Sequence, residues 1–508
     1  MLRPDGLLPL NSGAYSARSL SSNAQRCINL YPEINPDETD PASSVTHYPR
    51  PGLRSLVKLD GGRARGVFTT SNGNLYAVVG ANVYSISALF QPTLLGAIGP
   101  QLTPVSMTDN GVTAVIVDGT PNGYTVNLFN NAFAGLVDPT GLFQGSVRAD
   151  YSDTFMIFAT PVTRNWFTSL SNQVAFDPLI SASKTSYPDA IQTIIFNLRQ
   201  AWLLGTYGSE VWFLSGGASF PYAEVPNVYI PYGCIAPYSI AQADVGIYWL
   251  SANHQGEAII VRGDSQTYAV TAISTRALEY EFSTYLTTTD AIAYTYQQAG
   301  HTFYCISFPS ANKSWAYDLS TRQWHQRASI DNNGNLNRER VAFATKAYGV
   351  NVGQDWATGE LYAIDLQTFT DNGQPIVCLR SFPHVLQGLK RVTHTSFIAD
   401  FAAGTQPGTG TPQPTADFNR DFNSYFADSF GAVAFAQEPM LFLRYSNDGG
   451  HKWSNPRGRG MITAGNYRTL MRWRSLGLAR DRVYEVSWSA PMLTALQGAY
   501  LDLQMTGS

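Results

Sequence analysis

Residues 66–86 read GVFTTSNGNLYAVVGANVYSI and contain the pattern that decides the fold. Three runs rich in apolar and aromatic side chains, at 66–68, 75–80 and 83–86, are separated by short stretches of Asn, Gly, Ser and Thr. Runs of this length between turn-forming residues are typical of short β-strands joined by tight turns. We therefore predict an antiparallel sheet unit at this place in the chain.

The same pattern returns along the chain at intervals of roughly 40 to 50 residues, the period of propeller blades. Further units occupy 105–126, 147–167, 191–213, 240–261 and 291–318, and a possible seventh occupies 341–365. The second run of each unit is nearly continuously apolar, as expected for a strand that is buried on both faces. We predict an all-β chain with a β-propeller over 61–373, and the number of blades stays open. A series of β-sandwiches is the rival fold, but it does not explain the even spacing.

The segments outside the repeat differ in character from the blades. The proline-rich residues 1–60 are predicted to form an extended N-terminal arm with a few apolar anchors. Residues 374–403 and 438–508 are predicted to form a C-terminal β region, which either closes the ring of blades or forms an additional smaller β domain. Residues 404–437 start with the linker-like GTQPGTGTPQP and continue as a Phe-rich insertion. Its Phe418, Phe422, Phe426 and Phe430 are four residues apart and are a candidate docking stripe, or else part of their own domain's core or of a loop.

Composition excludes several classes of protein. Only 14% of the 508 residues are charged and the net charge is −4, so no global field favours nucleic acid or membrane. The four cysteines form no CxxC pair, which fits a reducing compartment. The start of the chain does not resemble a signal peptide, and no apolar run is long enough to span a membrane. We expect synthesis in a cytoplasm and no membrane insertion.

No catalytic constellation can be assembled from the motifs. The seven histidines form no HxH or HExxH arrangement, and neither a GxSxG elbow nor a phosphate-binding glycine loop occurs. No pair of carboxylates stands out as an acid and base. We predict that the protein is not an enzyme and requires neither a metal nor another cofactor.

One local motif, SNDGGHKW at 446–453, matches the Asp-box S-x-D-x-G-x-x-W of sialidases and other propellers. Its carriers here are Ser446, Asp448, Gly450 and Trp453. The Asp caps a turn and Gly tolerates positive φ, so we predict a structural turn and no active site. The motif and the abundant aromatic residues leave a carbohydrate-binding or sialidase-like glycan-degrading propeller as the alternative function.

Arginines follow this motif with few acids between them. Arg472 and Arg474 alternate with Met471 and Trp473, so a strand would place both arginines on one face. The face is interpreted either as a contact to DNA phosphates or an acidic neighbouring subunit, or as a solvated surface. The candidate contact residues are Arg468, Arg472, Arg474, Arg480 and Arg482.

Motifs spread over almost the whole chain resemble one family, the tail hub or packaged DNA stabilisation proteins of short-tailed bacteriophages. The N-terminal motifs are NLYPE at 29–33 and RPGL at 50–53. The central motifs are GSEVWF at 208–213, GCIAP at 233–237, WL at 249–250, GHTFY at 300–304, WAYD at 315–318 and WH at 324–325. The C-terminal motifs are the Asp-box, GNYR at 465–468 and RWRSLG at 472–477. The segment from about 404 to 437 has no counterpart and resembles an insertion.

The resemblance implies a structural virion protein of the phage tail with no catalytic residues. It implies a six-fold ring of identical subunits below the portal and head-to-tail adaptor, which extends the DNA channel and helps to retain the packaged double-stranded DNA. Tail fibres or tailspikes, and a tail needle or plug, are the other partners that it implies. The contacts of a ring between identical subunits are heterologous, and rigid blades with many loops can supply them.

Overall fold

The computed structural model describes residues 6–10, 13–34, 45–217, 219–331, 333–388, 390–403, 439–461 and 468–505. The chain divides into two compact units. We call Leu53–Arg322 with Arg327–Asp365 the propeller unit, and Met1–Gly52, Gln323–Gln326 and Leu366–Ser508 the sandwich unit. Each unit is described by itself.

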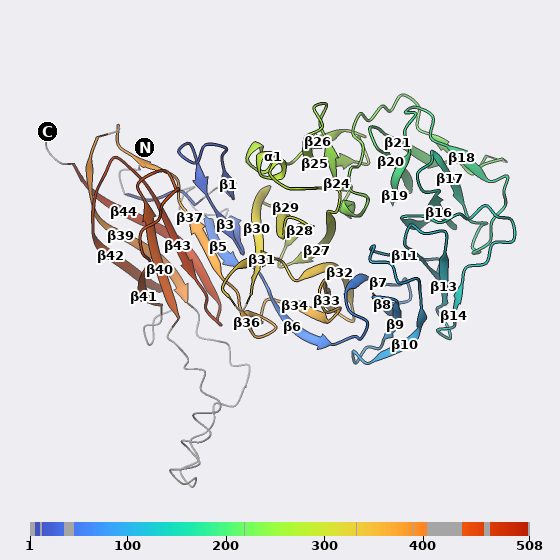
Figure 1. Cartoon of the computed structure of the whole chain (residues 1–508), viewed down its shortest axis with the longest axis horizontal. Helices are drawn as coiled ribbons and strands as arrows, with labels where there is room; N and C mark the ends of the chain where they lie inside the picture. Colours follow the sequence, from blue (N-terminus) through green and yellow to red (C-terminus); the bar gives the residue numbers. More distant parts are fainter. Residues whose placement is uncertain are drawn as a thin grey trace, which may run out of the picture. The chain divides into compact units, whose positions relative to one another are not determined.

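The described part of the propeller unit contains seven consecutive sheets, arranged around a common axis in Figure 1. The first five sheets have four strands each: β7 (Ala64–Thr69), β8 (Leu75–Val79), β9 (Asn82–Ile86) and β10 (Pro92–Ala97); β11 (Ser106–Asp109), β12 (Thr113–Val117), β13 (Gly123–Asn127) and β14 (Phe133–Gly135); β15 (Ala149–Ser152), β16 (Phe155–Ala159), β17 (Asn165–Thr168) and β18 (Ser181–Ser183); β19 (Ile191–Asn197), β20 (Gln200–Gly205), β21 (Ser209–Leu214) and β22 (Tyr222–Glu224); β23 (Ala241–Ala243), β24 (Gly246–Ala252), β25 (Ala258–Asp264) and β26 (Val270–Ala272). The sixth consists of β27 (Ile292–Gln298), β28 (His301–Phe308), β29 (Lys313–Asp318) and β30 (Gln323–Ile330), followed by β31 (Leu336–Arg338).

The second strand of a blade is buried on both faces, which explains its continuous apolar sequence. All five residues of β8 are fully buried. Leu75 and Val79 pack in a cluster with residues of the seventh sheet, whereas Tyr76 and Val78 pack with residues of the second. Because side chains alternate across a strand, each blade reaches both neighbours through one short run of residues. The stacked sheets thus share one core around the ring.

The ring closes with a strand from the N-terminal side of the repeat. The seventh sheet contains β32 (Val341–Ala347), β33 (Val350–Asp355) and β34 (Leu361–Asp365), and its fourth strand is β6 (Gly52–Val57). The innermost strands β32 and β7 lie next to each other, so the last sheet contacts the first. As a compact unit the propeller covers residues 53–322 and 327–365, where the sequence predicted 61–373. The earlier start reflects β6, whose polar-apolar mixture conceals its place in a blade.

A glycine permits close approach at the centre of the ring. Gly66 lies on the inner strand β7, and a Cβ atom there would be 2.7 Å from a methyl carbon of Val105. Any side chain would therefore push the first two blades apart near the axis.

Two short helical elements complete the propeller unit: a 3-10 turn, η1 (Pro237–Ser239), and α1 (Arg276–Ser283). The α1 helix begins after Thr275, whose side chain accepts a hydrogen bond from the Leu278 N–H, and it buries Leu278 and Phe282. Among the described residues, no helix is long and apolar enough to cross a membrane.

The sandwich unit contains two sheets of five strands over a shared apolar core. One sheet has the order β4 (Leu30–Ile34), β5 (Val45–Pro49), β44 (Thr494–Met505), β39 (Val392–Ala403) and β42 (Arg468–Ala479). The strands of the other follow the order β3 (Cys27–Ile28), β37 (Cys378–Ser381), β43 (Asp481–Trp488), β40 (Met440–Ser446) and β41 (Arg457–Gly460). Minor strands are β1 (Tyr15–Ser16), β2 (Ala24–Gln25), β35 (Thr370–Asp371), β36 (Gln374–Pro375) and β38 (Val385–Leu386).

The N-terminal segment is part of this sandwich, which corrects the prediction of an extended arm over residues 1–60. Leu7, Leu8 and Leu10 are buried, and the Leu8 N–H donates to the Ala499 carbonyl oxygen at 2.8 Å. The prolines that suggested an arm are compatible with strands at a sheet edge, and Pro32 lies in the edge strand β4. Of the two roles considered for the C-terminal region, the structure shows a separate β unit, because β6 closes the ring.

Candidate functional site

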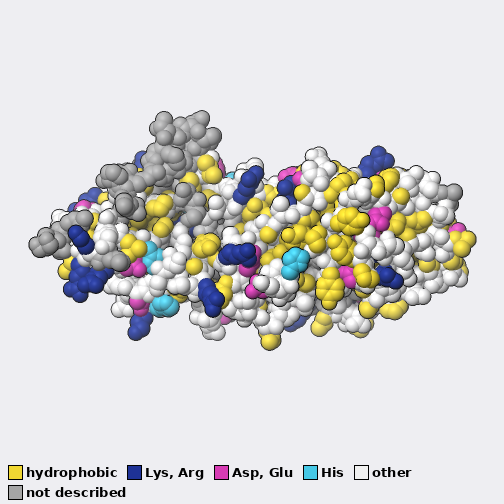
Figure 2. Space-filling view, turned by 90° about the horizontal axis from the view of Figure 1, so that it is seen from above, with side chains coloured by type: hydrophobic (Ala, Val, Ile, Leu, Met, Phe, Trp, Pro, Cys, Tyr) yellow, Lys and Arg dark blue, Asp and Glu magenta, His cyan; other side chains and the backbone are white. Residues whose placement is uncertain are grey.

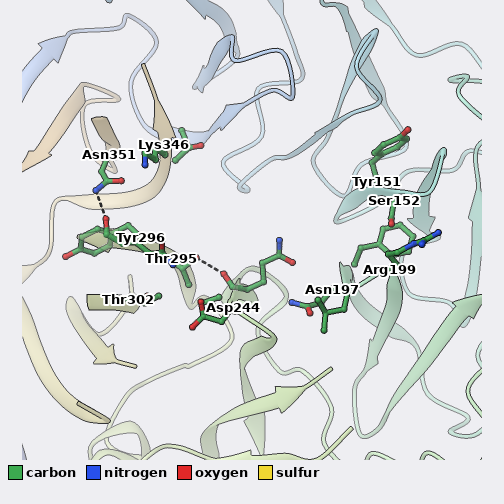
Figure 3. Close-up of a pocket in the computed structure, with 16 residues that line it drawn as sticks. Tyr151, Ser152, Asn197, Arg199, Asp244, Thr295, Tyr296, Thr302, Lys346 and Asn351 are labelled. Atoms are coloured by element: carbon green, nitrogen blue, oxygen red, sulfur yellow. Dashed lines mark hydrogen bonds between the residues drawn. The ribbon is translucent and has the colours of Figure 1, made fainter. Parts of the chain in front are cut away.

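The inner strands of the propeller surround a polar pocket of 520 Å³ at one end of the ring (Figure 3). Its lining comes from the ends of β15, β19, β23, β27 and β32. Arg199, Asp244 and Lys346 are the charged side chains among the lining residues, and Arg199 pairs with Asp153 at 2.7 Å. Since a single carboxylate lines the pocket, no acid-base pair is formed there.

The pocket wall is held by hydrogen bonds between neighbouring blades. Asn351 Nδ2 donates to the Gln297 carbonyl oxygen at 2.9 Å, and Thr295 Oγ1 donates to the Gln242 carbonyl oxygen at 2.9 Å. Asn197 Oδ1 is buried and has no hydrogen-bond partner in the described part of the chain. The arrangement can hold polar groups or water, and it provides no nucleophile activated by a base.

A second pocket of 250 Å³ lies where the inner strands begin, and most of the residues that line it are apolar. Arg148 is the one charged side chain among its lining residues. Burial lowers the pKa of this arginine, which nearby Asp150 partly offsets. Burial in turn raises the pKa of Asp150, opposed by Arg148. Across the described residues, no three His, Cys, Asp or Glu side chains are grouped as a metal site would require.

Two buried arginines are hydrogen-bonded inside the propeller, and the sequence analysis predicted neither. Arg65 donates to the carbonyl oxygens of Thr103, Gly80 and Gly99 and pairs with Asp118 at 2.9 Å. The signal that could have found it is an arginine within an otherwise apolar inner strand.

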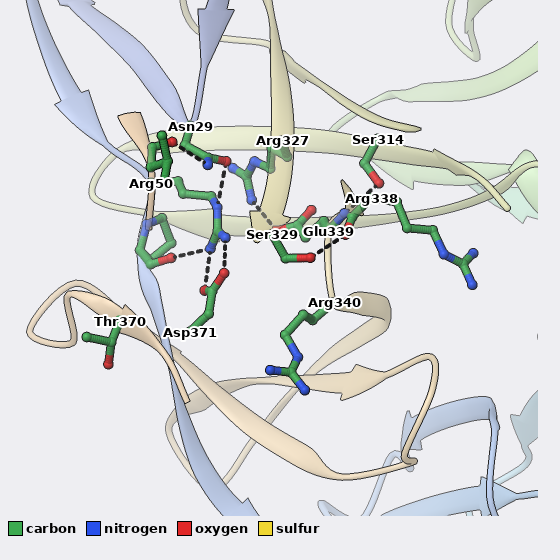
Figure 4. Close-up of polar contacts among 12 residues, drawn as sticks. Asn29, Arg50, Ser314, Arg327, Ser329, Arg338, Glu339, Arg340, Thr370 and Asp371 are labelled. Carbon is green, nitrogen blue, oxygen red and sulfur yellow. Dashed lines mark hydrogen bonds and ion pairs between the residues drawn. The ribbon is translucent and has the colours of Figure 1, made fainter. Parts of the chain in front are cut away.

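Arg327 is the second of these arginines and is drawn in Figure 4. It pairs with Glu339 at 3.2 Å and lies over the Phe303 ring. Its side chain is 1% exposed, so the pair is a structural element of the propeller and offers no free charge to a ligand.

The Asp-box lies in the sandwich unit, in the hairpin that joins β40 to β41. Ser446 Oγ donates to Asp448 Oδ1 at 2.7 Å, and the Lys452 N–H donates to the same oxygen at 2.8 Å. The Gly450 N–H donates to Ser446 Oγ at 2.8 Å, and Gly450 has a φ of +99°. The Trp453 ring packs under the Arg444 guanidinium at 4.8 Å. These contacts are those of a turn, as its residues predict.

The five candidate arginines have three different environments in the sandwich unit. Arg472, Arg474 and Arg480 are exposed. Arg468 forms a bidentate pair with Asp400, and this pairing raises its pKa. Arg482 is 1% exposed and donates to the Leu476 carbonyl oxygen at 2.7 Å.

Arg482 is therefore removed from the set of candidate contacts. Its guanidinium lies over the Tyr445 ring at 4.2 Å, inside the sandwich. It lies in β43, where residues 482–486 are all buried, whereas the β42 arginines alternate with the buried Met471 and Trp473 and face outward.

A shallow groove of 550 Å³ lies beside the exposed arginines. It is lined by residues of β39, β42 and β44: Thr393, His394, Thr395, Ser396, Arg472, Arg474, Ser475, Gly477, Asp502 and Gln504. Burial, assisted by the positive charge of Arg482, lowers the pKa of His394 to about 4. The histidine is therefore neutral at physiological pH, and the two arginines dominate the charge of the groove.

The N-terminal motifs NLYPE and RPGL meet in the sandwich unit at a buried arginine (Figure 4). Arg50 forms a bidentate pair with Asp371, with Nη1 2.9 Å from Oδ1. Its Nε donates to Asn29 Oδ1 at 2.9 Å, and Asn29 Nδ2 donates to the Val377 carbonyl oxygen at 2.8 Å. The motif was recognised in the sequence, but its structural role depends on Asp371, more than 300 residues away. The predicted docking stripe Phe418, Phe422, Phe426 and Phe430 lies outside the described residues.

Comparison with known proteins connects these features to one family. The family model described as "Bacteriophage P22 Gp10, beta-propeller" matches residues 7–368, which is most of the chain. No curated protein matches the chain.

Solved structures with a related outline are distant in sequence. The WD40 β-propeller domain of Doa1 has 10% identity and a TM-score of 0.38, over 61% of this chain and 96% of that one. The extracellular domain of the putative hybrid two-component system BT3049 from B. thetaiotaomicron has 11% identity and a TM-score of 0.42, over 65% of this chain and 43% of that one.

The family match covers the N-terminal motifs of the sandwich unit and all seven blades, and it agrees with the tail-hub resemblance of the sequence. The chain therefore belongs to the bacteriophage P22 Gp10 β-propeller family, the tail hub or packaged DNA stabilisation proteins of short-tailed phages.

Proposed function

We propose that the protein is a structural component of the virion tail, made in the host cytoplasm and assembled as a six-fold ring below the portal and head-to-tail adaptor. The family match carries this proposal, since it covers most of the chain. In this role the ring extends the DNA channel, helps to retain the packaged DNA, and anchors tail fibres or tailspikes and a needle or plug.

The propeller supports a scaffolding role because its ring is closed and internally tied. Arg65 and Arg327 are buried and hydrogen-bonded in the propeller core, and β6 pairs with β34 to complete the last blade. A rigid block with loops on both faces can form heterologous contacts with identical neighbours and with other tail proteins. The loops carry exposed apolar side chains that suit such contacts, among them Leu89, Phe129, Val162 and Leu286.

The glycan-degrading alternative has less support. Its Asp-box stabilises a hairpin of the sandwich unit, and the axial pocket is lined by one carboxylate. A retaining or inverting glycosidase needs two carboxyl groups, or a comparable nucleophile and acid, around the scissile bond.

Electron microscopy of the purified full chain, together with particles assembled without it, tests the proposal. We expect a six-fold ring with a central channel, and heads that lose their DNA when the protein is absent. A chain that stays monomeric with adaptor present, and particles that keep their genome without it, would contradict the proposal. Hydrolysis of bacterial surface glycans by the purified chain would instead favour the enzyme.

A further inference from the structure

The edge strand β42 of the sandwich unit carries exposed arginines. Arg472 and Arg474 are exposed on β42 and have no ion-pair partner among the described residues. By contrast, Arg468 on the same strand is paired with Asp400, and Arg444 is paired with Glu485. We propose that β42 is a docking strip for the phosphate backbone of double-stranded DNA, and that Arg472 and Arg474 each contact a phosphate of one DNA strand. The proposal rests on the proposed function, because it assumes that DNA passes along this protein.

The position of β42 leaves its edge accessible to a linear ligand. In the order β4-β5-β44-β39-β42 it is the last strand, and among the described strands it pairs only with β39. Residues two apart on a strand face the same side and are separated by about 7 Å. Phosphates on one DNA strand advance about 3.4 Å each along the helix axis, so arginines separated by about 7 Å span two such steps, and each can contact a phosphate of the same backbone.

The surrounding sequence concentrates positive charge without opposing acids. Residues 457–480 contain six arginines and no Asp, Glu or Lys. Arg457, Arg459 and Arg480 are exposed in addition to the pair on β42. Dark-blue side chains accordingly gather over the sandwich unit at the left of Figure 2. Arginine suits this ligand better than lysine, because its planar fork binds two phosphate oxygens at once.

The groove next to the pair adds uncharged donors at the same place. Ser396, Ser475 and Gln504 line it, and the buried atoms His394 Nε2 and Thr395 Oγ1 have no hydrogen-bond partner in the described structure. Tyr484 hydroxyl lies 2.8 Å from His394 Nδ1, and when it donates there, the free Nε2 carries the proton. Both unpartnered atoms are buried below the groove surface, so the uncharged donors that a phosphate can reach there are the hydroxyl of Ser475 and the amide of Gln504, which are exposed.

Two features of the strip argue for other occupants and define the controls. Asp502 lines the same groove and would repel a phosphate, so the net charge of the groove rests on both arginines together. Leu470 and Leu478 are 61% and 53% exposed on β42, and exposed apolar side chains are also typical of an edge that binds another protein. The row of arginines extends beyond these leucines along the segment, which favours an extended polyanion over a compact apolar contact.

The test measures binding of the full chain to a fluorescent duplex DNA by anisotropy at several salt concentrations. Each phosphate contact contributes about 0.9 to the slope of log K against log salt. Replacing both arginines, Arg472→Gln with Arg474→Gln, should lower that slope by about 1.8, which is about 60-fold in affinity at 0.1 M salt. The matched control is Arg164→Gln with Arg276→Gln, which removes the same charge from exposed positions of the propeller unit. It should leave the slope within about 0.5 of the unmodified chain.

Three results would overturn the proposal. The unmodified chain does not bind the duplex, or the strip and control variants have equal salt slopes, or the arginines are needed for binding to phosphatidylglycerol vesicles while the duplex is not bound. Loss of ring assembly in the strip variant with an unchanged DNA slope would identify the strip as a protein interface.

Folding and the proposed function are checked separately. If the double variant has a lowered melting temperature, the single variants Arg472→Gln and Arg474→Gln replace it, each with an expected slope change of about 0.9. If the ring forms and particles retain their DNA, but the strip variant binds duplex DNA normally, only the proposal for β42 is refuted. Failure of the unmodified chain to enter tails would refute the proposed function.

Discussion

Truncating Arg50 should destabilise the sandwich unit far more than its position in a connecting loop suggests. The residue follows β5, yet it is only 3% exposed and its partner Asp371 is 1% exposed. Besides the bidentate pair, Arg50 donates to Asn29 Oδ1 at 2.9 Å and to the Pro51 carbonyl oxygen at 3.0 Å. One side chain therefore connects the N-terminal strands to the segment that leads into β37.

The expected cost follows from leaving a charge buried. In Arg50→Met the buried carboxylate of Asp371 loses its ion pair with Arg50, which costs about 4 kcal/mol for a buried pair. The double variant Arg50→Met with Asp371→Leu removes both charges and should recover all but about 1 or 2 kcal/mol. The remaining loss reflects the hydrogen bonds that Asn29 and the Pro51 carbonyl no longer receive.

Hydrogen exchange with peptide resolution measures this effect in the full chain. About 4 kcal/mol raises the opening equilibrium of the sandwich-unit amides about a thousandfold, while amides of β8 or β20 in the propeller serve as the internal reference. Arg276→Met is the matched control, because its side chain is 82% exposed and should cost less than about 0.5 kcal/mol. An increase below tenfold in Arg50→Met, or a double variant as unstable as the single one, would refute the reasoning.

Three further perturbations test other parts of the structure. Leu53→Ala, at a side chain that is 1% exposed on β6, should cost about 2 to 5 kcal/mol and should speed exchange in β34, about 300 residues away, if β6 closes the ring. Hydrogen bonds from the Lys452 N–H and the Ser446 hydroxyl lower the pKa of Asp448. The hairpin is therefore stabilised above the ordinary carboxyl pKa and loses this stabilisation as the pH falls through the lowered pKa. Amide exchange of the hairpin between pH 5 and 2 should show the loss, and Asp448→Ala should abolish the pH dependence. Burial, assisted by Arg482, lowers the pKa of His394 from 6.5 to about 4, so between these two pH values only the unfolded state binds the proton. The free energy of unfolding should therefore fall by up to about 1.4 kcal/mol per pH unit as the pH drops through this range. Chemical denaturation at pH 7 and at pH 5 should show a smaller difference in stability for His394→Gln than for the unmodified chain.

The blades could be predicted because their signal is local. In β8 and in the other second strands, both faces of the strand are buried, so a short apolar run bounded by turn residues identifies the element without knowledge of its neighbours. The exposure of Arg472 and Arg474 was likewise predictable, since it follows from alternation with Met471 and Trp473. The Asp-box turn belongs to the same class, because its hydrogen bonds join residues within six positions of one another.

Other features depend on which distant segments meet, and local patterns carry no record of that. β6 resembles a strand of any sheet, and only its pairing with β34 makes it the closing strand of the ring. The proline-rich N-terminus suggested an arm, because the buried environment of Leu7, Leu8 and Leu10 is supplied by strands near residue 500. Arg482 resembles its exposed neighbours in sequence, yet carbonyl oxygens and Tyr445 enclose it.

The sequence by itself thus determined the repeating strand-turn units, the face on which the β42 arginines lie, and the family. Only the tertiary structure decided the closure of the ring, the joining of both chain ends into one sandwich, and which charges are buried in pairs. The physical reason is that strand periodicity reflects the alternation of buried and exposed sides along a few residues. Closure and pairing depend instead on long-range packing and on the cost of burying charge, as between Arg50 and Asp371, and neither is encoded in the neighbouring residues.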